Sequence, residues 1–220
     1  MRLTYVLTLL AGMTCLPFAA LAHEDPFDFG SKYYQVSGVE DGDTLNVRAE
    51  ATARSDTIGE LAPGAGPIEV LATKDGWGQI VSQERNGWVS LKFLKEVDVP
   101  LLGETSLPGG LTCFGTEPFW GLTLGADGTA ILDDIILDEP TAFEIGSVQS
   151  AAARFHVTWI KLKRDVEERG NALIRRSACS DGMSDALYPY TADISVDIGQ
   201  DEQRIVTGCC SLPGPEQVQR

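Results

Sequence analysis

The chain has 220 residues, of which 17 are Lys or Arg and 32 are Asp or Glu, so its formal net charge is −15. Such an acidic surface repels nucleic acid and anionic lipid, which excludes nucleic acid as a partner. The length allows two domains, each with a modest hydrophobic core.

The first segment, residues 1–22, has the pattern of a secretory signal peptide. Arg2 precedes an apolar run, and small residues stand directly before the expected cleavage site at His23. Cleavage removes one charged residue, Arg2, so the exported chain carries 16 minus 32, or −16. We expect a periplasmic or secreted protein that is not an integral membrane protein. Cys15 raises lipoprotein anchoring as an alternative, which the residues 12–14 before it do not favour.

Residues 23–33 lack a hydrophobic period and are expected to form an exposed N-terminal arm. The next segment, residues 34–95, contains short apolar runs separated by turn residues, as a meander of short strands does. In one of these runs, Leu45-Asn46-Val47-Arg48, apolar and polar residues alternate. This alternation predicts a strand with Leu45 and Val47 in a core and with Asn46 and Arg48 facing outward.

Two dipeptides in the same segment, Asp75-Gly76 and Asn86-Gly87, are two-residue hairpin signals. Each is followed directly by a tryptophan, Trp77 or Trp88. Short strands joined in this way favour a small barrel, because closure removes the exposed edges of short sheets.

The motifs D-T-L-N-V-R, I-G-x-L, D-G-W and N-G-W-V occur here in the order and spacing of bacterial SH3 (SH3b) domains. Residues 34–95 therefore resemble that family, which implies an SH3-like small barrel that binds peptidoglycan or a protein partner. The family usually has a Gly-Pro turn after its N-V-R, whereas this chain has Ala49 to Ala53. Since loops on a rigid barrel usually carry binding, the ligand specificity of the family cannot be transferred.

Polar and aromatic groups of this domain are candidate ligand-binding residues: Tyr34, Asn46, Arg48, Trp77 and Trp88. Arg48 is equally consistent with a structural salt bridge, and we expect both tryptophans to contribute partly to packing.

Residues 96–111 are rich in Pro and Gly and are predicted to be a linker, followed by a C-terminal β domain at residues 112–212 and a tail at 213–220. Ala126-Asp127-Gly128-Thr129 predicts a hairpin turn, and residues 154–164 alternate as a strand does. Three further strands are expected at residues 172–178, 191–198 and 204–208. The predicted fold class is therefore all-β, with an antiparallel barrel or sandwich after the SH3-like barrel.

The second domain contains four motifs: G-T-E-P-F-W at 115–120, C-S-D-G-M-S-D at 179–185, Y-P-Y-T-A at 188–192 and G-C at 208–209. Together they resemble an uncharacterised family of proteobacterial envelope proteins, some of them lipoproteins. The resemblance implies export and a small β domain and brings no catalytic mechanism. Within the first motif, Glu117 and Trp120 could contact a sugar or peptide ligand, although a tryptophan at the start of a strand, like Trp120, more often packs in the core.

Four cysteines remain after cleavage: Cys113, Cys179, Cys209 and Cys210. An even number in an oxidising compartment predicts two disulfides. A bridge between the neighbours Cys209 and Cys210 would be strained, so Cys113 and Cys179 should each pair with one of them.

Residue types suited to catalysis or metal binding do not combine into a catalytic set. His156 lies in a strand pattern, and the neighbours Asp133 and Asp134 should point to opposite faces of a strand. The acidic loop with Asp181 and Asp185 lacks the spacing of a calcium site, and a turn capped by its own Asp side chains fits better. We expect no cofactor, no metal and no enzymatic activity.

Two functions remain. The first is an exported envelope protein whose SH3-like domain binds peptidoglycan or a protein partner. The alternative is a hydrolase or a lysozyme-type inhibitor in the C-terminal domain, which the SH3-like domain targets to the wall. A cleft that contains Glu117, Asp181 or His156 with a strongly shifted pKa would favour the alternative.

Overall fold

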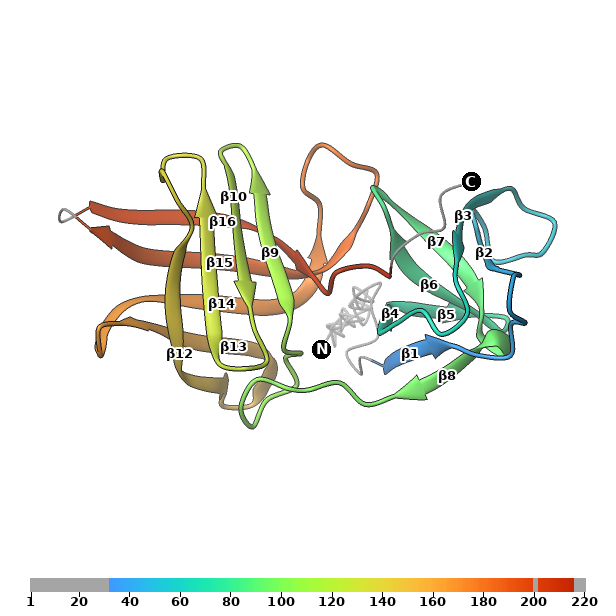
Figure 1. Cartoon of the computed structure of the whole chain (residues 1–220), viewed down its shortest axis with the longest axis horizontal. Helices are drawn as coiled ribbons and strands as arrows, with labels where there is room; N and C mark the ends of the chain where they lie inside the picture. The colour runs from blue at the N-terminus through green and yellow to red at the C-terminus, as the bar shows by residue number, and fades with distance from the viewer. Residues whose placement is uncertain (1–31, 200–201, 216–220) are drawn as a thin grey trace, which may run out of the picture.

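The structure, a computed structural model, describes residues 32–199 and 202–215. The predicted signal peptide, Cys15, most of the predicted arm and the end of the predicted tail lie outside the described residues. Figure 1 shows two β units side by side, an N-terminal unit of short strands and a C-terminal barrel of longer ones.

The N-terminal unit consists of two small antiparallel sheets. One has the order β4-β1-β8 and the other the order β3-β2-β7-β6-β5. The strands are β1 (Lys32–Val36), β2 (Leu45–Arg48), β3 (Thr57–Leu61), β4 (Ile68–Val70), β5 (Ala72–Lys74), β6 (Trp77–Ser82), β7 (Arg85–Ser90) and β8 (Leu94–Val97), with one 3-10 turn, η1 (Leu91–Phe93).

Both sheets contribute to one hydrophobic core, which includes Val36, Val47, Ile68 and Val89. In β2 the predicted alternation is confirmed, since Leu45 and Val47 are buried while Asn46 and Arg48 are half-buried. The predicted N-terminal arm ends earlier than expected, because β1 already begins at Lys32 and pairs with β4 and β8.

One of the two predicted hairpin turns is confirmed and the other is wrong. Asp75 and Gly76 connect β5 to β6, and both have positive φ angles, 50° and 83°. Asn86 and Gly87 instead lie inside β7, so the turn after β6 falls at residues 83–84. Gly87 serves close packing rather than a turn, because a Cβ atom there would meet Val47 Cγ1 at 2.4 Å.

The C-terminal unit is a closed antiparallel barrel of eight strands, which decides between the predicted barrel and sandwich. Consecutive strands pair in order and β16 returns to β9. The strands are β9 (Leu111–Thr116), β10 (Phe119–Leu124), β11 (Thr129–Asp134), β12 (Thr141–Ala151), β13 (Arg154–Arg164), β14 (Glu167–Cys179), β15 (Tyr188–Gly199) and β16 (Glu202–Ser211).

Aliphatic side chains fill the barrel interior, among them Leu122, Leu132, Ile160, Ile174 and Ile194, as expected for a barrel of this strand number. Leu102 and Leu107 belong to the same core, so the predicted linker is partly packed rather than exposed throughout.

Two disulfides stabilise the barrel, in a pairing consistent with the one predicted. Cys113 bonds to Cys210 and Cys179 bonds to Cys209. The first bridge joins β9 to β16, the two strands whose pairing closes the barrel.

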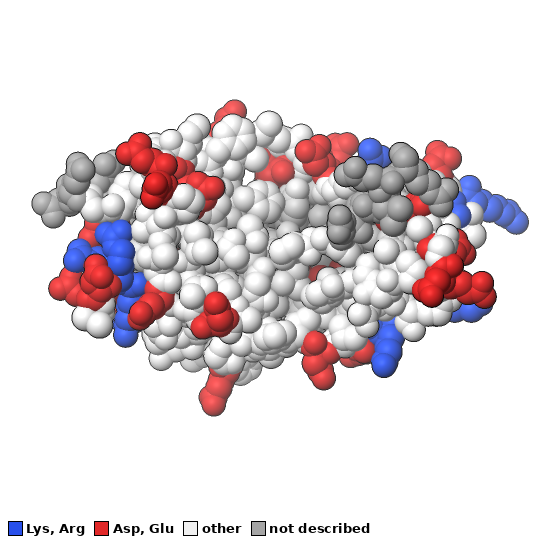
Figure 2. Space-filling view, viewed as in Figure 1, with Lys and Arg blue, Asp and Glu red and all other residues white. Residues whose placement is uncertain are grey.

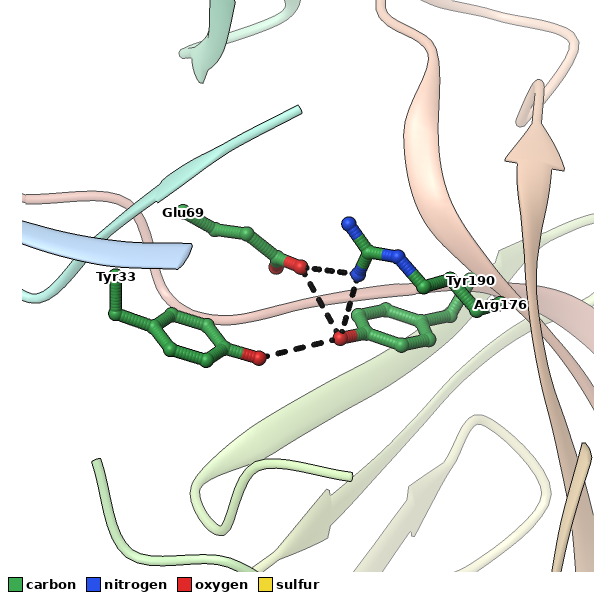
Figure 3. A network of polar contacts seen from close by, with 4 residues as sticks. All are labelled: Tyr33, Glu69, Arg176 and Tyr190. Carbon is green, nitrogen blue, oxygen red and sulfur yellow. Dashed lines mark hydrogen bonds and ion pairs between the residues drawn. The ribbon is translucent and has the colours of Figure 1, made fainter. Parts of the chain in front are cut away.

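A buried polar network connects the two units (Figure 3). Arg176 of the barrel donates to the carboxylate of Glu69 in β4 at 2.5 Å, and both side chains are only 6% exposed. The hydroxyl of Tyr190 accepts from Arg176 at 2.9 Å and lies 3.0 Å from the same Glu69 oxygen. Tyr33 of β1 approaches the Tyr190 hydroxyl at 3.4 Å. The network therefore joins the β4-β1-β8 sheet to the barrel through buried groups.

Candidate functional site

The five-stranded sheet has an outward face that carries two tryptophans. Trp88 in β7 lies opposite Arg48 of β2 and opposite Gln79 of β6, while Trp77 lies opposite Ser90. Directly paired residues of antiparallel strands project from the same side of the sheet, so these five side chains share one face. All five are half-buried, whereas their strand neighbours enter the core. We call this set the tryptophan face.

Arg48 is held in place on the tryptophan face by residues that follow the segment Ala49 to Ala53. Its Nη1 donates to the carbonyl of Ser55 and to the hydroxyl of Thr57, both at 2.9 Å. Thr57 in turn contacts Asn46 at 3.4 Å. Within residues 32–199 and 202–215, Arg48 forms no ion pair, so its charge is available to an anionic ligand.

Tyr34 does not join this face. It lies in β1, in the other sheet, and packs half-buried against the core of the N-terminal unit. The structure therefore brings together Asn46, Arg48, Trp77 and Trp88 among the predicted ligand residues of this domain and leaves Tyr34 apart.

Trp120 is mostly buried, and only a small part of it reaches the surface. Its side chain is 5% exposed and belongs to the barrel core. The indole fills space above two glycines, since a Cβ atom at Gly115 would meet Trp120 Nε1 at 2.1 Å and one at Gly208 would meet Cζ2 at 2.8 Å. This packing supports a structural role for Trp120 in the barrel core.

A second concave surface lies around the loop of residues 180–187, where the two units meet. Two hollows of about 440 and 560 Å³ border this loop and share Phe114, Thr116 and Asp181. The smaller one contains Glu117, and the larger one contains Glu84 from the turn between β6 and β7. We call the two hollows together the junction groove.

Two motifs that are far apart in the sequence build the junction groove. Thr116 of G-T-E-P-F-W donates its hydroxyl hydrogen to the carbonyl of Asp181, in C-S-D-G-M-S-D, at 2.8 Å. The carboxylate of Asp181 accepts from the N–H groups of Met183 and Ser184 at 3.0 and 2.8 Å. The expected self-capped turn is therefore present.

Electrostatics of the groove follow from these contacts. Burial would raise the pKa of Asp181, but the hydrogen bonds from Ser184 and Met183 outweigh it and lower the pKa below its ordinary value of 3.8. Burial raises the pKa of the nearby Tyr188 hydroxyl, and the charge of Asp181 adds to the effect. Asp181 is therefore anionic at neutral pH, and its lowered pKa does not suit it to act as a general acid.

The β6–β7 hairpin of the N-terminal unit also holds the loop of residues 180–187 in place. The side chain of Asn86 accepts from the N–H of Leu187 at 2.7 Å and donates to its carbonyl at 3.0 Å. The N–H of Asp185 donates to the carbonyl of Glu84 at 3.1 Å. The sequence does not predict these hydrogen bonds, because Asn86 has the signature of a turn residue.

The remaining candidate residues lie on two strands of the barrel, β11 and β13. His156 is exposed on β13, and Asp133 is exposed while Asp134 is buried and paired with Arg204 at 2.7 Å, as the strand alternation predicts. Across the described ranges no group of three or more His, Cys, Asp or Glu residues could hold a metal ion. In the same ranges, no helix is both long and apolar enough to span a bilayer.

Comparison with protein families found that residues 43–95 match the bacterial SH3 domain. The match covers β2 to β7 and the start of β8, which includes the tryptophan face. A search of curated proteins and a search of solved structures found no match. The chain thus contains a bacterial SH3 domain at residues 43–95, joined to a disulfide-bonded eight-stranded barrel.

Proposed function

We propose that this protein is an exported cell-envelope binding protein whose SH3 domain binds peptidoglycan through the tryptophan face. The observation that most supports this proposal is that Trp77, Trp88 and Arg48 share one outward face within the matched domain. A protein partner is the other ligand class that fits a bacterial SH3 domain, and it would use the same groups.

The chemistry of the face suits a glycopeptide. Indole rings offer flat apolar surfaces for sugar rings or aliphatic peptide side chains, and they lose little conformational freedom on binding. The guanidinium of Arg48 can bind a carboxylate of a stem peptide through two parallel hydrogen bonds. On a chain whose formal net charge is −15, a cation held by loop contacts gives the face a local attraction for such groups.

Export is supported by the signal-like residues 1–22 and by the two disulfides, which form and persist in oxidising compartments. A binding role rather than catalysis is supported by the position of His156, which is exposed on β13 and lines neither hollow of the junction groove, and by the lowered pKa of Asp181.

Co-sedimentation of the full-length oxidised protein with purified peptidoglycan tests the proposal. The full chain is needed because Glu69 and Arg176 would be left unpaired in separated domains. We expect Trp77→Ala and Arg48→Gln each to lower the bound fraction, by about tenfold in affinity for a central aromatic contact. Trp159→Ala is the matched control, since Trp159 is an exposed tryptophan on the barrel.

Wild-type protein that stays in the supernatant would rule out peptidoglycan as the ligand. Equal losses in Trp77→Ala and Trp159→Ala would show that binding does not depend on the tryptophan face.

A further inference from the structure

We infer that the junction groove is a second binding site, which takes a basic amphipathic segment of a partner protein. This site uses residues of both units and does not require the tryptophan face to bind anything.

Exposed apolar side chains mark the groove as a contact surface. Phe119 and Ile135 line the larger hollow and are 58% and 70% exposed, and Met183 lines the smaller one and is 67% exposed. Single exposed apolar residues are common, but three large ones around connected hollows of about 440 and 560 Å³ form a concave apolar surface. A ligand must therefore supply apolar side chains.

The charged side chains of the groove favour a ligand of positive charge. Glu84, Asp133 and Asp181 line the larger hollow, Glu117 joins Asp181 in the smaller one, and neither lining includes a Lys or Arg among the described residues. Figure 2 shows that one broad face of the molecule carries few charges in its middle, with both acidic and basic groups toward its margins. An anionic ligand would be repelled by four carboxylates, whereas Lys or Arg side chains would be attracted to them.

The acidic groups are spread over several elements, which favours an extended ligand over a single ion. Glu84 comes from the β6–β7 turn, Asp133 from β11, Glu117 from the β9–β10 turn and Asp181 from the loop after β14. Positive charges spaced along a peptide segment, with apolar side chains between them, match this arrangement of carboxylates around apolar residues.

The groove is held in shape before any ligand binds. The loop of residues 180–187 follows Cys179, which bonds to Cys209, and Thr116 and Asn86 fix its two halves by hydrogen bonds. A preformed site loses less conformational entropy on binding, which supports useful affinity from a modest contact area.

Fluorescence anisotropy on the full-length oxidised protein tests this inference. The probe is a labelled synthetic peptide of Lys and Leu residues in an amphipathic pattern. Two matched peptides replace every Lys by Glu or every Leu by Ser. We expect the Lys-Leu peptide to bind at least about tenfold more tightly than either control peptide, and to bind more weakly as salt is added.

Groove variants locate the binding. Ile135→Ala and Phe119→Ala should each weaken binding about fivefold to tenfold, since 1.4 kcal/mol corresponds to tenfold. Glu84→Gln combined with Asp133→Asn should weaken binding and reduce its salt dependence. Ile205→Ala and Glu104→Gln are matched controls on exposed residues outside the groove lining and should bind as wild type does.

The variant Trp77→Ala should also bind the Lys-Leu peptide normally, which separates this inference from the proposed peptidoglycan site. Unchanged affinity in both Ile135→Ala and the Glu84→Gln, Asp133→Asn double variant would overturn the inference, because the peptide would then bind elsewhere on the acidic surface. Equal binding of the Glu-Leu peptide would also overturn it.

Discussion

The buried pair Glu69–Arg176 should dominate the coupling between the SH3 unit and the barrel. The variant Arg176→Met removes the cation while keeping an unbranched side chain in the same space. Glu69 then remains 6% exposed at the side chain without the Nη1 donor that lies 2.5 Å from its Oε1. Removing one partner of a buried ion pair destabilises a protein by roughly 3–5 kcal/mol, because the other charge is left uncompensated.

Urea unfolding and thermal melting measure this loss. For a chain of this size 1 kcal/mol corresponds to roughly 2–4 °C, so Arg176→Met should lower Tm by roughly 6–20 °C. The exposed pair Lys32–Glu96, at 3.1 Å with side chains 60% and 59% exposed, provides the control. Glu96→Gln should change stability by less than about 1 kcal/mol.

A double variant, Arg176→Met with Glu69→Leu, should recover most of the loss, since replacing both partners removes the unpaired charge. A Tm for Arg176→Met within a degree or two of wild type would refute the reasoning, because the pair would then be hydrated or unimportant for coupling.

Three further predictions concern packing, disulfides and pH. Gly87→Ala should destabilise the protein by roughly 1–3 kcal/mol in urea unfolding, because the new Cβ atom would meet Val47 Cγ1 at 2.4 Å, and a neutral result would show that the sheet yields easily. Replacing Cys113 and Cys210 by Ser should lower stability more than replacing Cys179 and Cys209, since the sequence separations are 97 and 30 and the stabilisation from loop closure grows with length, to roughly 4–5 kcal/mol for the longer loop; equal losses in paired melts would contradict this. The pKa of Asp181 is lower in the folded state, so its stabilisation is fully present above 3.8 and is lost as pH falls through the folded value. As the pH is lowered from 5, the free energy of unfolding should therefore fall more for wild type than for Asp181→Asn. An equal fall in both proteins would exclude a role for this carboxylate.

The strand content of the SH3 unit was predictable because its motifs report local geometry. Leu45 and Val47 alternate with Asn46 and Arg48, and a period of two residues specifies which side of a sheet each one faces. The disulfide pairing was limited by the same kind of local argument, since the neighbours Cys209 and Cys210 disfavour a mutual bridge.

The features that the sequence did not predict depend on contacts between distant segments. Asn86-Gly87 has a turn signature, but Gly87 is required by the close approach of Val47, which is 40 residues earlier in the numbering and invisible to local pattern analysis. The Glu69–Arg176 pair joins two units whose relative placement no motif encodes. Tyr34 lies half-buried in the other sheet, away from the tryptophan face, because pairing between distant strands places it there.

Indole N–H resonances of the ¹⁵N-labelled full-length protein test the central proposal most directly. The chain has four tryptophans, and each gives one indole signal. On titration with soluble peptidoglycan fragments we expect the signals of Trp77 and Trp88 to shift, because both lie on the proposed ligand-binding face. The signals of Trp120, buried in the barrel core, and of Trp159, on the barrel exterior, should stay in place. Shifts confined to Trp159, or none at saturating fragment concentration, would contradict peptidoglycan binding by the tryptophan face.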